Sequence, residues 1–180
     1  MTNRAGPVEL DLDAAVALVV DAAASARAGA RPFELVVPGG RGLLPLLAPL
    51  AARGLPGPGW RLHLSDERVV PRGHPDRNVD AVADLLGLPT GEPGPATAGA
   101  VDAAAPVLLG PPDDATGLPS AGGWAATLAG SPPFDLTILG LGPDGHTAGL
   151  FPGRAYGAAA DAPDVLEAPA AGGPPHRRLT

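Results

Sequence analysis

The sequence contains no cysteine and no lysine, and it is poor in aromatic residues. Without cysteine, neither a disulfide framework nor thiolate chemistry is open to the protein. All 12 basic residues are arginine and they face 19 acidic ones, for a formal net charge of −7. Because nucleic-acid-binding proteins are usually basic, we expect no nucleic-acid partner. Aromatics make up 3% of a chain that is 45% hydrophobic, so the expected core is aliphatic.

Long apolar stretches are also missing. No run approaches the roughly 20 residues that a membrane-spanning helix needs. The N-terminal segment MTNRAGPVELDLDAA carries acidic side chains. A signal peptide would need a basic start and an unbroken apolar segment there. We therefore expect no membrane partner and a cytoplasmic location.

Glycine and proline, in contrast, are abundant, with 26 and 24 copies. They cluster in residues 54–59, 87–99, 110–123 and 168–175, and the segments between these clusters have ordinary helix and strand patterns. A chain of 180 residues is long enough for one domain with a real hydrophobic core. We expect a single α/β domain with long loops rich in proline and glycine.

Helices and short apolar strands alternate along the chain. Helices are predicted at residues 11–28, 43–52, 78–86 and 120–129, and strands at residues 33–37, 60–64, 106–109, 134–139 and 165–167. The strand at 134–139 has the strongest pattern. This order predicts an open, mostly parallel Rossmann-like α/β sheet with helices on both faces. Ligands of such sheets bind beyond the carboxyl ends of the strands, where the tips 38–42, 65–68 and 140–146 should converge.

The first tip contains Gly39, Gly40, Arg41 and Gly42. Glycine-rich turns before a helix let backbone amides approach a phosphate, so this tip is a candidate anion site. A plain strand-to-helix turn would also use glycine, for its freedom at positive φ. The pattern is neither a nucleotide-binding P-loop nor the dinucleotide fingerprint.

The second tip places Asp66, Glu67 and Arg68 directly after an apolar strand. A solvated surface run of charges is the simple interpretation. The position at the end of a buried strand favours binding instead, because Arg68 offers a planar fork suited to phosphate. His74 follows in a polar loop that can line the same cleft.

The third tip holds Asp144 and His146 two positions apart in a glycine-rich loop. A carboxylate can orient a histidine that acts as a general base near neutral pH, although a lone histidine is more often structural. His63 lies inside a strand and is expected to be packed. We predict no metal site and no cofactor, because no ligand spacing typical of zinc appears. A serine nucleophile is not indicated either, since no G-x-S-x-G elbow is present.

Together these segments resemble 6-phosphogluconolactonases, over residues from about 8 to the last. Residues 38–42 are similar to the family's Ser/Pro-Gly-Gly-x-Thr-Pro loop, 66–71 (DERVVP) to its DERxVP segment and 74–78 (HPDRN) to a loop that ends in Ser-Asn. Residues 139–153 (LGLGPDGHTAGLFPG) are similar to its most specific motif. The related glucosamine-6-phosphate deaminases have DEY instead of DER, and His-Ile-Ala-Phe-Asn-Glu-Pro where this chain has His-Thr-Ala-Gly-Leu-Phe-Pro.

The resemblance implies hydrolysis of 6-phospho-D-glucono-1,5-lactone to 6-phosphogluconate, in the oxidative pentose phosphate pathway. The expected partner is then a phosphorylated sugar lactone. The resemblance also implies roles for the residues of the three tips. His146 would act as base with Asp144 orienting it, and the substrate and its phosphate would be bound by the following residues: Gly39, Gly40, Arg41, Gly42, Asp66, Glu67, Arg68 and His74.

Three features depart from the family pattern. Gly42 and Leu43 replace Thr-Pro in the first loop, and Arg77 stands where the family has serine. The resemblance also implies a further C-terminal strand and helices, with a phosphate-binding lysine, after Thr180. We expect this chain to lack them and to self-associate through the side left uncovered. A non-catalytic sugar-phosphate-binding protein and a deaminase-like isomerase are the alternative functions.

Overall fold

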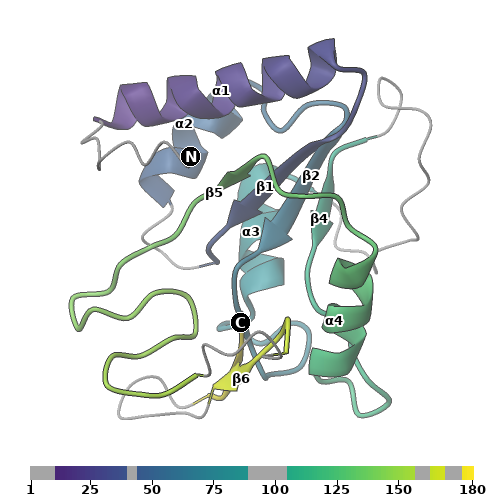
Figure 1. Cartoon of the computed structure of the whole chain (residues 1–180), viewed down its shortest axis with the longest axis vertical. Coiled ribbons are helices and arrows are strands. Elements are labelled where there is room, and N and C mark those ends of the chain that lie inside the picture. The colour runs from purple at the N-terminus through teal and green to yellow at the C-terminus, as the bar shows by residue number, and fades with distance from the viewer. Residues whose placement is uncertain (1–10, 40–43, 89–104, 157–162, 169–175) are drawn as a thin grey trace, which may run out of the picture.

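The computed structural model describes residues 11–39, 44–88, 105–156, 163–168 and 176–180. Its centre is a parallel sheet with the strand order β4-β2-β1-β5 (Figure 1). The strands are β1 (Phe33–Val37), β2 (Trp60–Leu64), β4 (Val107–Leu109) and β5 (Leu136–Thr137). The predicted α/β fold with a parallel sheet is therefore confirmed.

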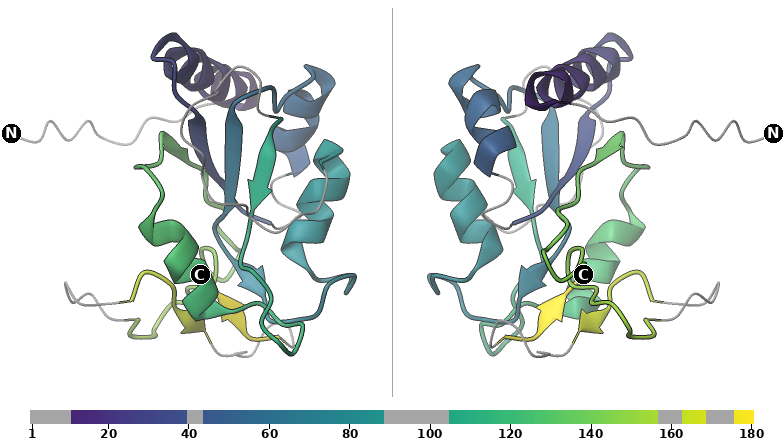
Figure 2. Two further views of the ribbon diagram at one scale, coloured as in Figure 1. Left: turned by 90° about the vertical axis from the view of Figure 1, so that its right-hand side faces the viewer. Right: turned by 90° about the vertical axis from the view of Figure 1, so that its left-hand side faces the viewer.

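Among the described residues, four helices flank this sheet, close to the predicted ranges. They are α1 (Leu12–Ala28), α2 (Leu44–Ala52), α3 (Asn78–Leu86) and α4 (Ala121–Ala129). Asp11 caps α1, since its Oδ1 accepts a hydrogen bond from the Ala14 amide at 2.8 Å. Ser120 caps α4 in the same way, by accepting from the Gly123 amide at 3.1 Å, and both are residue types preferred at this position. Figure 2 shows α2 and α3 on one side of the sheet and α4 on the other.

The core is mainly aliphatic and centres on β1, in which all five residues are buried. Trp60 and Trp124 are buried as well. A buried polar pair lies within the sheet: Glu34 Oε2 is 2.6 Å from Nε2 of His63, which is 2% exposed. His63 is thus packed as predicted, and its partner on β1 explains how a polar ring is accommodated there.

The strand at 134–139 differs from its prediction as the strongest strand. Only Leu136 and Thr137 form β5, at the edge of the sheet beside β1, and Phe134 and Leu139 are 42% and 52% exposed. The amides of Asp135 and Ile138 donate hydrogen bonds to the carbonyls of Glu34 and Val36, and these bonds extend the pairing of β5 with β1 slightly. The apolar pattern predicted burial on both faces. An edge position, with one neighbouring strand among the described residues, accounts for the difference.

A small antiparallel sheet lies beyond the carboxyl ends of the main strands. Its order is β3 (Glu67–Arg68), β7 (Arg178–Leu179) and β6 (Glu167–Ala168). The short strand predicted at 165–167 therefore starts later, although Leu166 exchanges two backbone hydrogen bonds with Thr180. This sheet brings the last described residues next to the second tip. Among the described residues, no helix is both long and apolar enough to cross a membrane.

Candidate functional site

The first two tips meet through Asn78, the first residue of α3. Its Nδ2 donates to the Asp66 carbonyl oxygen at 2.8 Å. Gly39 lies so close to it that an added Cβ would be 2.1 Å from the Asn78 Cγ, so a larger residue does not fit there. The convergence predicted from the sequence is thus observed for Gly39 and Asp66. Gly40, Arg41 and Gly42 lie outside the described residues.

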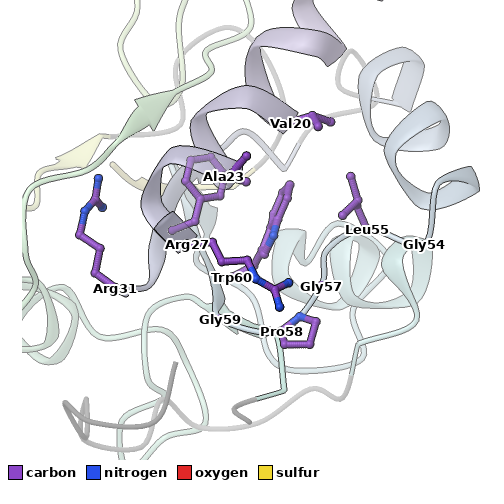
Figure 3. A pocket seen from close by; sticks show the side chains of 12 residues that line it. Val20, Ala23, Arg27, Arg31, Gly54, Leu55, Gly57, Pro58, Gly59 and Trp60 are labelled. Atoms are coloured by element: carbon purple, nitrogen blue, oxygen red, sulfur yellow. The ribbon is translucent and has the colours of Figure 1, made fainter. Parts of the chain in front are cut away.

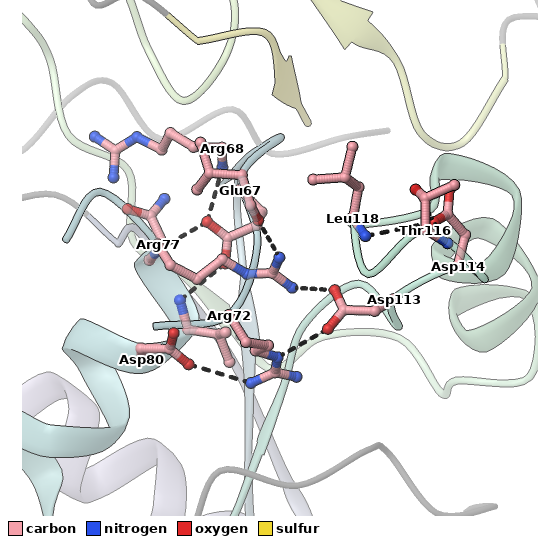
Figure 4. Close-up of polar contacts among 12 residues, drawn as sticks. Glu67, Arg68, Arg72, Arg77, Asp80, Asp113, Asp114, Thr116 and Leu118 are labelled. Atoms are coloured by element: carbon pink, nitrogen blue, oxygen red, sulfur yellow. Dashed lines mark hydrogen bonds and ion pairs between the residues drawn. The ribbon is translucent and has the colours of Figure 1, made fainter. Parts of the chain in front are cut away.

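Glu67 is fully buried and serves the start of α3 (Figure 4). Its Oε1 accepts from the Asn78 amide at 2.7 Å and its Oε2 from the Val79 amide at 2.9 Å. Arg77, also fully buried, places Nε 3.2 Å from Oε2. A carboxylate at a helix N-terminus is favoured by the free amides and by the helix dipole.

Glu67 was grouped from the sequence with the substrate-binding residues, and in the structure both carboxylate oxygens accept hydrogen bonds from amides at the start of α3. Burial raises the pKa of Glu67, and the hydrogen bonds from backbone amides and the charge of Arg77 oppose this effect only in part. Because the neighbours of both oxygens are donors, the ionised form is the one that satisfies them. Figure 4 shows the Arg68 guanidinium pointing away from this network.

The third tip holds His146 against Asp144. Nδ1 of His146 contacts Asp144 Oδ1 at short range, and the His146 amide donates to the same oxygen at 3.3 Å. The hydrogen bond to His146 lowers the pKa of Asp144, which keeps this carboxylate ionised. The loop turns at Gly145, whose positive φ favours glycine. The ring stacks on Phe151 with centroids 5.2 Å apart, and Nε2 is the nitrogen not engaged with Asp144.

Asp66 and Arg178 connect the third tip to the second. Arg178 Nη1 lies 3.6 Å from Asp66 Oδ2 and donates to the Ala148 carbonyl at 3.0 Å, and the guanidinium lies over the Phe151 ring. Burial raises the pKa of Asp66, against the positive charges of Arg68, Arg178 and His146. The second and third tips therefore share one electrostatic environment.

Arg178 is a candidate site residue that was not predicted from the sequence. Burial and the neighbouring Arg68 lower the pKa of Arg178. The negative charges of Asp66 and Asp144 oppose this shift. The guanidinium groups of Arg68 and Arg178, which are paired across β3 and β7, thus lie on the same side of the small antiparallel sheet. Two neighbouring positive charges suit the binding of an anion.

Thr180, which follows β7, contacts both the second tip and the segment after the third tip. Its Oγ1 donates to the Ser65 carbonyl at 3.0 Å and accepts from the Gly149 amide at 3.2 Å. An added Cβ on Gly149 would be 2.9 Å from the Thr180 Cβ. The second tip, the third tip and β7 are therefore joined by side-chain and backbone contacts.

His74 is placed differently from the other predicted site residues. Its ring lies edge-on to that of His176, with centroids 5.0 Å apart, and its Nδ1 accepts from the Asp76 amide at 3.1 Å. The structure thus pairs His74 with the segment before β7 and not with the His146 loop.

Two cavities help to locate the site. One, of about 390 Å³, lies at the amino ends of β1 and β2 beside α1 (Figure 3), and is therefore at the opposite end of the sheet from the three tips. The other, of about 260 Å³, lies between α4 and β5 and reaches Thr147 and Ala148. Its lining is mainly apolar, which suits a sugar phosphate poorly. The polar surface beside it, at His146, Asp66 and Arg68, is the candidate site.

Known proteins resemble this chain in sequence and in fold. The family profile described as glucosamine-6-phosphate isomerases/6-phosphogluconolactonase matches residues 9–180. A 6-phosphogluconolactonase of Pseudomonas putida is 38% identical over 119 residues, covering 66% of this chain and 44% of that protein. One from Rattus norvegicus is 38% identical over 145 residues, covering 76% of this chain and 54% of that protein. The chain thus spans about half the length of these two relatives.

Solved structures agree in fold. The crystal structure of a 6-phosphogluconolactonase from Thermotoga maritima superposes with a TM-score of 0.70 at 24% identity, covering 94% of this chain and 72% of that one. A putative 6-phosphogluconolactonase from Neisseria gonorrhoeae gives a TM-score of 0.67 at 25% identity, covering 96% and 74%. With the profile match over nearly all of its length, this chain belongs to the glucosamine-6-phosphate isomerase/6-phosphogluconolactonase family.

Proposed function

We propose that this protein hydrolyses 6-phospho-D-glucono-1,5-lactone to 6-phosphogluconate, the lactonase step of the oxidative pentose phosphate pathway. Its named relatives in the family are 6-phosphogluconolactonases. Arg68 and the run 146–152 (HTAGLFP) favour this branch of the family over the isomerases. The substrate is thus a small phosphorylated sugar lactone.

The single observation that carries the proposal is the His146–Asp144 pair beside Asp66 and Arg178. A lactone is an activated ester, so water can attack it directly. His146 Nε2 takes a proton from the water as its oxygen bonds to C1 of the lactone. The bond between C1 and the ring oxygen then breaks, and the ring oxygen takes up a proton to become a hydroxyl. General-base help of this kind is typically worth about 10²–10⁴-fold in rate.

Asp144 supports this proton transfer in two ways. Its contact with Nδ1 fixes the ring orientation, which leaves Nε2 free to accept the proton. Its negative charge stabilises the imidazolium that forms. Phe151, stacked on the ring, limits the rotation of His146. Both residues position a group that reacts, and neither needs to touch the lactone.

Arg68 is the proposed phosphate ligand, together with the backbone amides of residues 39–42. A guanidinium can bind two phosphate oxygens at once, and this fixes the ring so that C1 meets His146. Arg178 adds positive charge nearby and holds Asp66, which faces the sugar hydroxyls. Binding at both ends of the substrate would orient the reacting carbon.

The test is a steady-state assay with freshly prepared lactone, in which 6-phosphogluconate is measured with a coupled dehydrogenase and spontaneous opening is subtracted. We expect activity in the wild-type chain and a KM roughly 10–100-fold higher in Arg68→Met, because a charge-assisted hydrogen bond is lost. Arg53→Met, an exposed arginine beside α2, is the matched control and should keep the wild-type KM. No product above the spontaneous rate, or deamination of glucosamine 6-phosphate instead, would contradict the proposal.

A further inference from the structure

Three potential metal ligands gather at the surface on the side of His74. His176 Nε2 lies 3.1 Å from Asp76 Oδ2, and His74 Nδ1 lies 4.0 Å from the same oxygen. Each of the three residues offers a ligand atom, and these atoms all lie within 4.8 Å of one another. His74 and His176 come from opposite halves of the sequence, so only the fold brings them together.

The spacing of these atoms is close to that of a zinc site. Tetrahedral zinc with bonds of about 2.0–2.1 Å places its ligand atoms roughly 3.3 Å apart. The separations of 3.1 and 4.0 Å from Asp76 Oδ2 fall on either side of this value. The side chains of His74, Asp76 and His176 are 32%, 49% and 22% exposed, so small rotations can close the remaining gap. A water molecule can supply the fourth ligand.

Hydrogen bonds already link the three residues. His176 Nε2 pairs with Asp76 Oδ2 at 3.1 Å, and His74 Nδ1 accepts from the Asp76 amide at 3.1 Å. A metal ion would take one lone pair from each of the three side chains at once, and at His74 Nδ1 it would displace the hydrogen bond from the amide. The other two histidines of the chain have different partners, since His63 is paired with Glu34 and His146 with Asp144.

No metal site was predicted from the sequence, because these three residues have no typical ligand spacing along the chain. From their arrangement in the fold, we propose that His74, Asp76 and His176 bind one divalent transition-metal ion, with zinc the best match. Two imidazole nitrogens favour zinc, nickel or copper over calcium and magnesium, which prefer oxygen ligands. The ion would sit outside the proposed lactonase site and would take no part in hydrolysis.

The ion would link two segments that are distant in sequence, the loop of His74 and Asp76 and the residues just before β7. Asp76 precedes Arg77, which is buried beneath the second tip, and His176 lies two residues before Arg178, which contacts Asp66. Because the ligands come together only in the folded chain, binding favours folding. A bound ion would therefore stabilise β7 and, with it, the position of Arg178.

Calorimetric titration of the tag-free full chain with zinc chloride tests the proposal, in a buffer without phosphate or chelator and alongside thermal unfolding. We expect one zinc per chain and a rise in Tm of roughly 5–10 °C at a concentration about 100 times Kd. Asp76→Asn and His176→Asn should each weaken zinc binding by at least about tenfold, since a direct ligand matters more than an outer partner. His146→Asn is the matched control, another partly exposed histidine paired with an aspartate, and should bind zinc as the wild type does.

Several results would overturn the site. They are no zinc binding by the wild type, unchanged binding in Asp76→Asn or His176→Asn, and loss of binding in His146→Asn. Circular dichroism without zinc shows whether the variants fold, and Asp76→Asn should pass this check because its side chain is half exposed. The readout is metal binding, so its failure is distinguishable from a failure of the lactonase proposal.

Discussion

Replacing Arg77 by methionine removes the guanidinium group at the centre of the buried network while keeping most of the side-chain volume. Nη1 donates to the Val70 carbonyl at 2.6 Å and Nη2 to Asp113 Oδ1 at 2.7 Å, while Nε is 3.2 Å from Glu67 Oε2. The variant leaves Glu67 fully buried and without its ion-pair partner. It leaves the Val70 carbonyl without this donor as well.

The magnitude follows from these contacts. Removing one partner of a buried ion pair typically costs about 3–5 kcal/mol. Asp113 keeps a second partner, since Arg72 Nε lies 3.2 Å from its Oδ2, so its share of the loss is small. We therefore expect Arg77→Met to lower the free energy of unfolding by about 3–5 kcal/mol, against a total of about 5–15 kcal/mol for a domain.

Urea unfolding followed by the fluorescence of the two buried tryptophans measures this change. Arg72→Met is the matched control, because Arg72 is 31% exposed and pairs with Asp80 and Asp113. Partly exposed pairs contribute about 0–1 kcal/mol, so the control should lose little. A loss below about 1 kcal/mol in Arg77→Met, or an equal loss in both variants, would refute the reasoning.

Two further predictions concern the candidate site. Burial raises the pKa of Asp66, so the unfolded chain ionises there at a lower pH than the folded one. The stability of the wild type relative to Asp66→Asn should therefore fall as the pH rises from about 4 to 7. Urea unfolding at a series of pH values measures the slope, and a difference that is flat or rises with pH would count against the burial argument. A Cβ on Gly142 would lie 2.2 Å from His146 Nδ1, whereas one on Gly140 meets nothing within 4 Å. In lactone assays, Gly142→Ala should lose most of the activity and Gly140→Ala should keep it; equal activities would show that the loop geometry does not constrain His146.

Local sequence predicted most of the helices and strands, because their signals are local. Residues 60–64 and 78–86 were predicted with the observed bounds. β5 was overestimated for a physical reason. Whether an apolar strand lies at the centre or at the edge of a sheet depends on its neighbours, and its own residues do not encode that.

The site was predictable in part. The pattern around Asp144 and His146 is contained within a few residues, so the pair could be identified from sequence. Glu67 could not be assigned, because a charged run after a strand has the same pattern whether it binds a ligand or caps a helix that starts eleven positions later. Arg77 stood out only as a departure from the family's serine, and the structure shows it as a buried anchor.

Long-range contacts set the limit of what the sequence could reveal. Arg178 and Asp66 lie far apart along the chain, and no periodicity or spacing connects the two. The same holds for His176 and Asp76, whose side chains meet across 100 positions. Such pairs are specified by the small antiparallel sheet, which forms from three two-residue strands with little local signal.

The central claim is that His146 of this chain acts as the base in lactone hydrolysis. The most direct measurement is kcat for 6-phosphogluconolactone in the wild type and in His146→Asn, with the spontaneous rate subtracted and the fold of the variant checked by circular dichroism. The account predicts that the variant retains its fold and that kcat falls by about 10²–10⁴-fold. A folded His146→Asn variant with the wild-type kcat would contradict it.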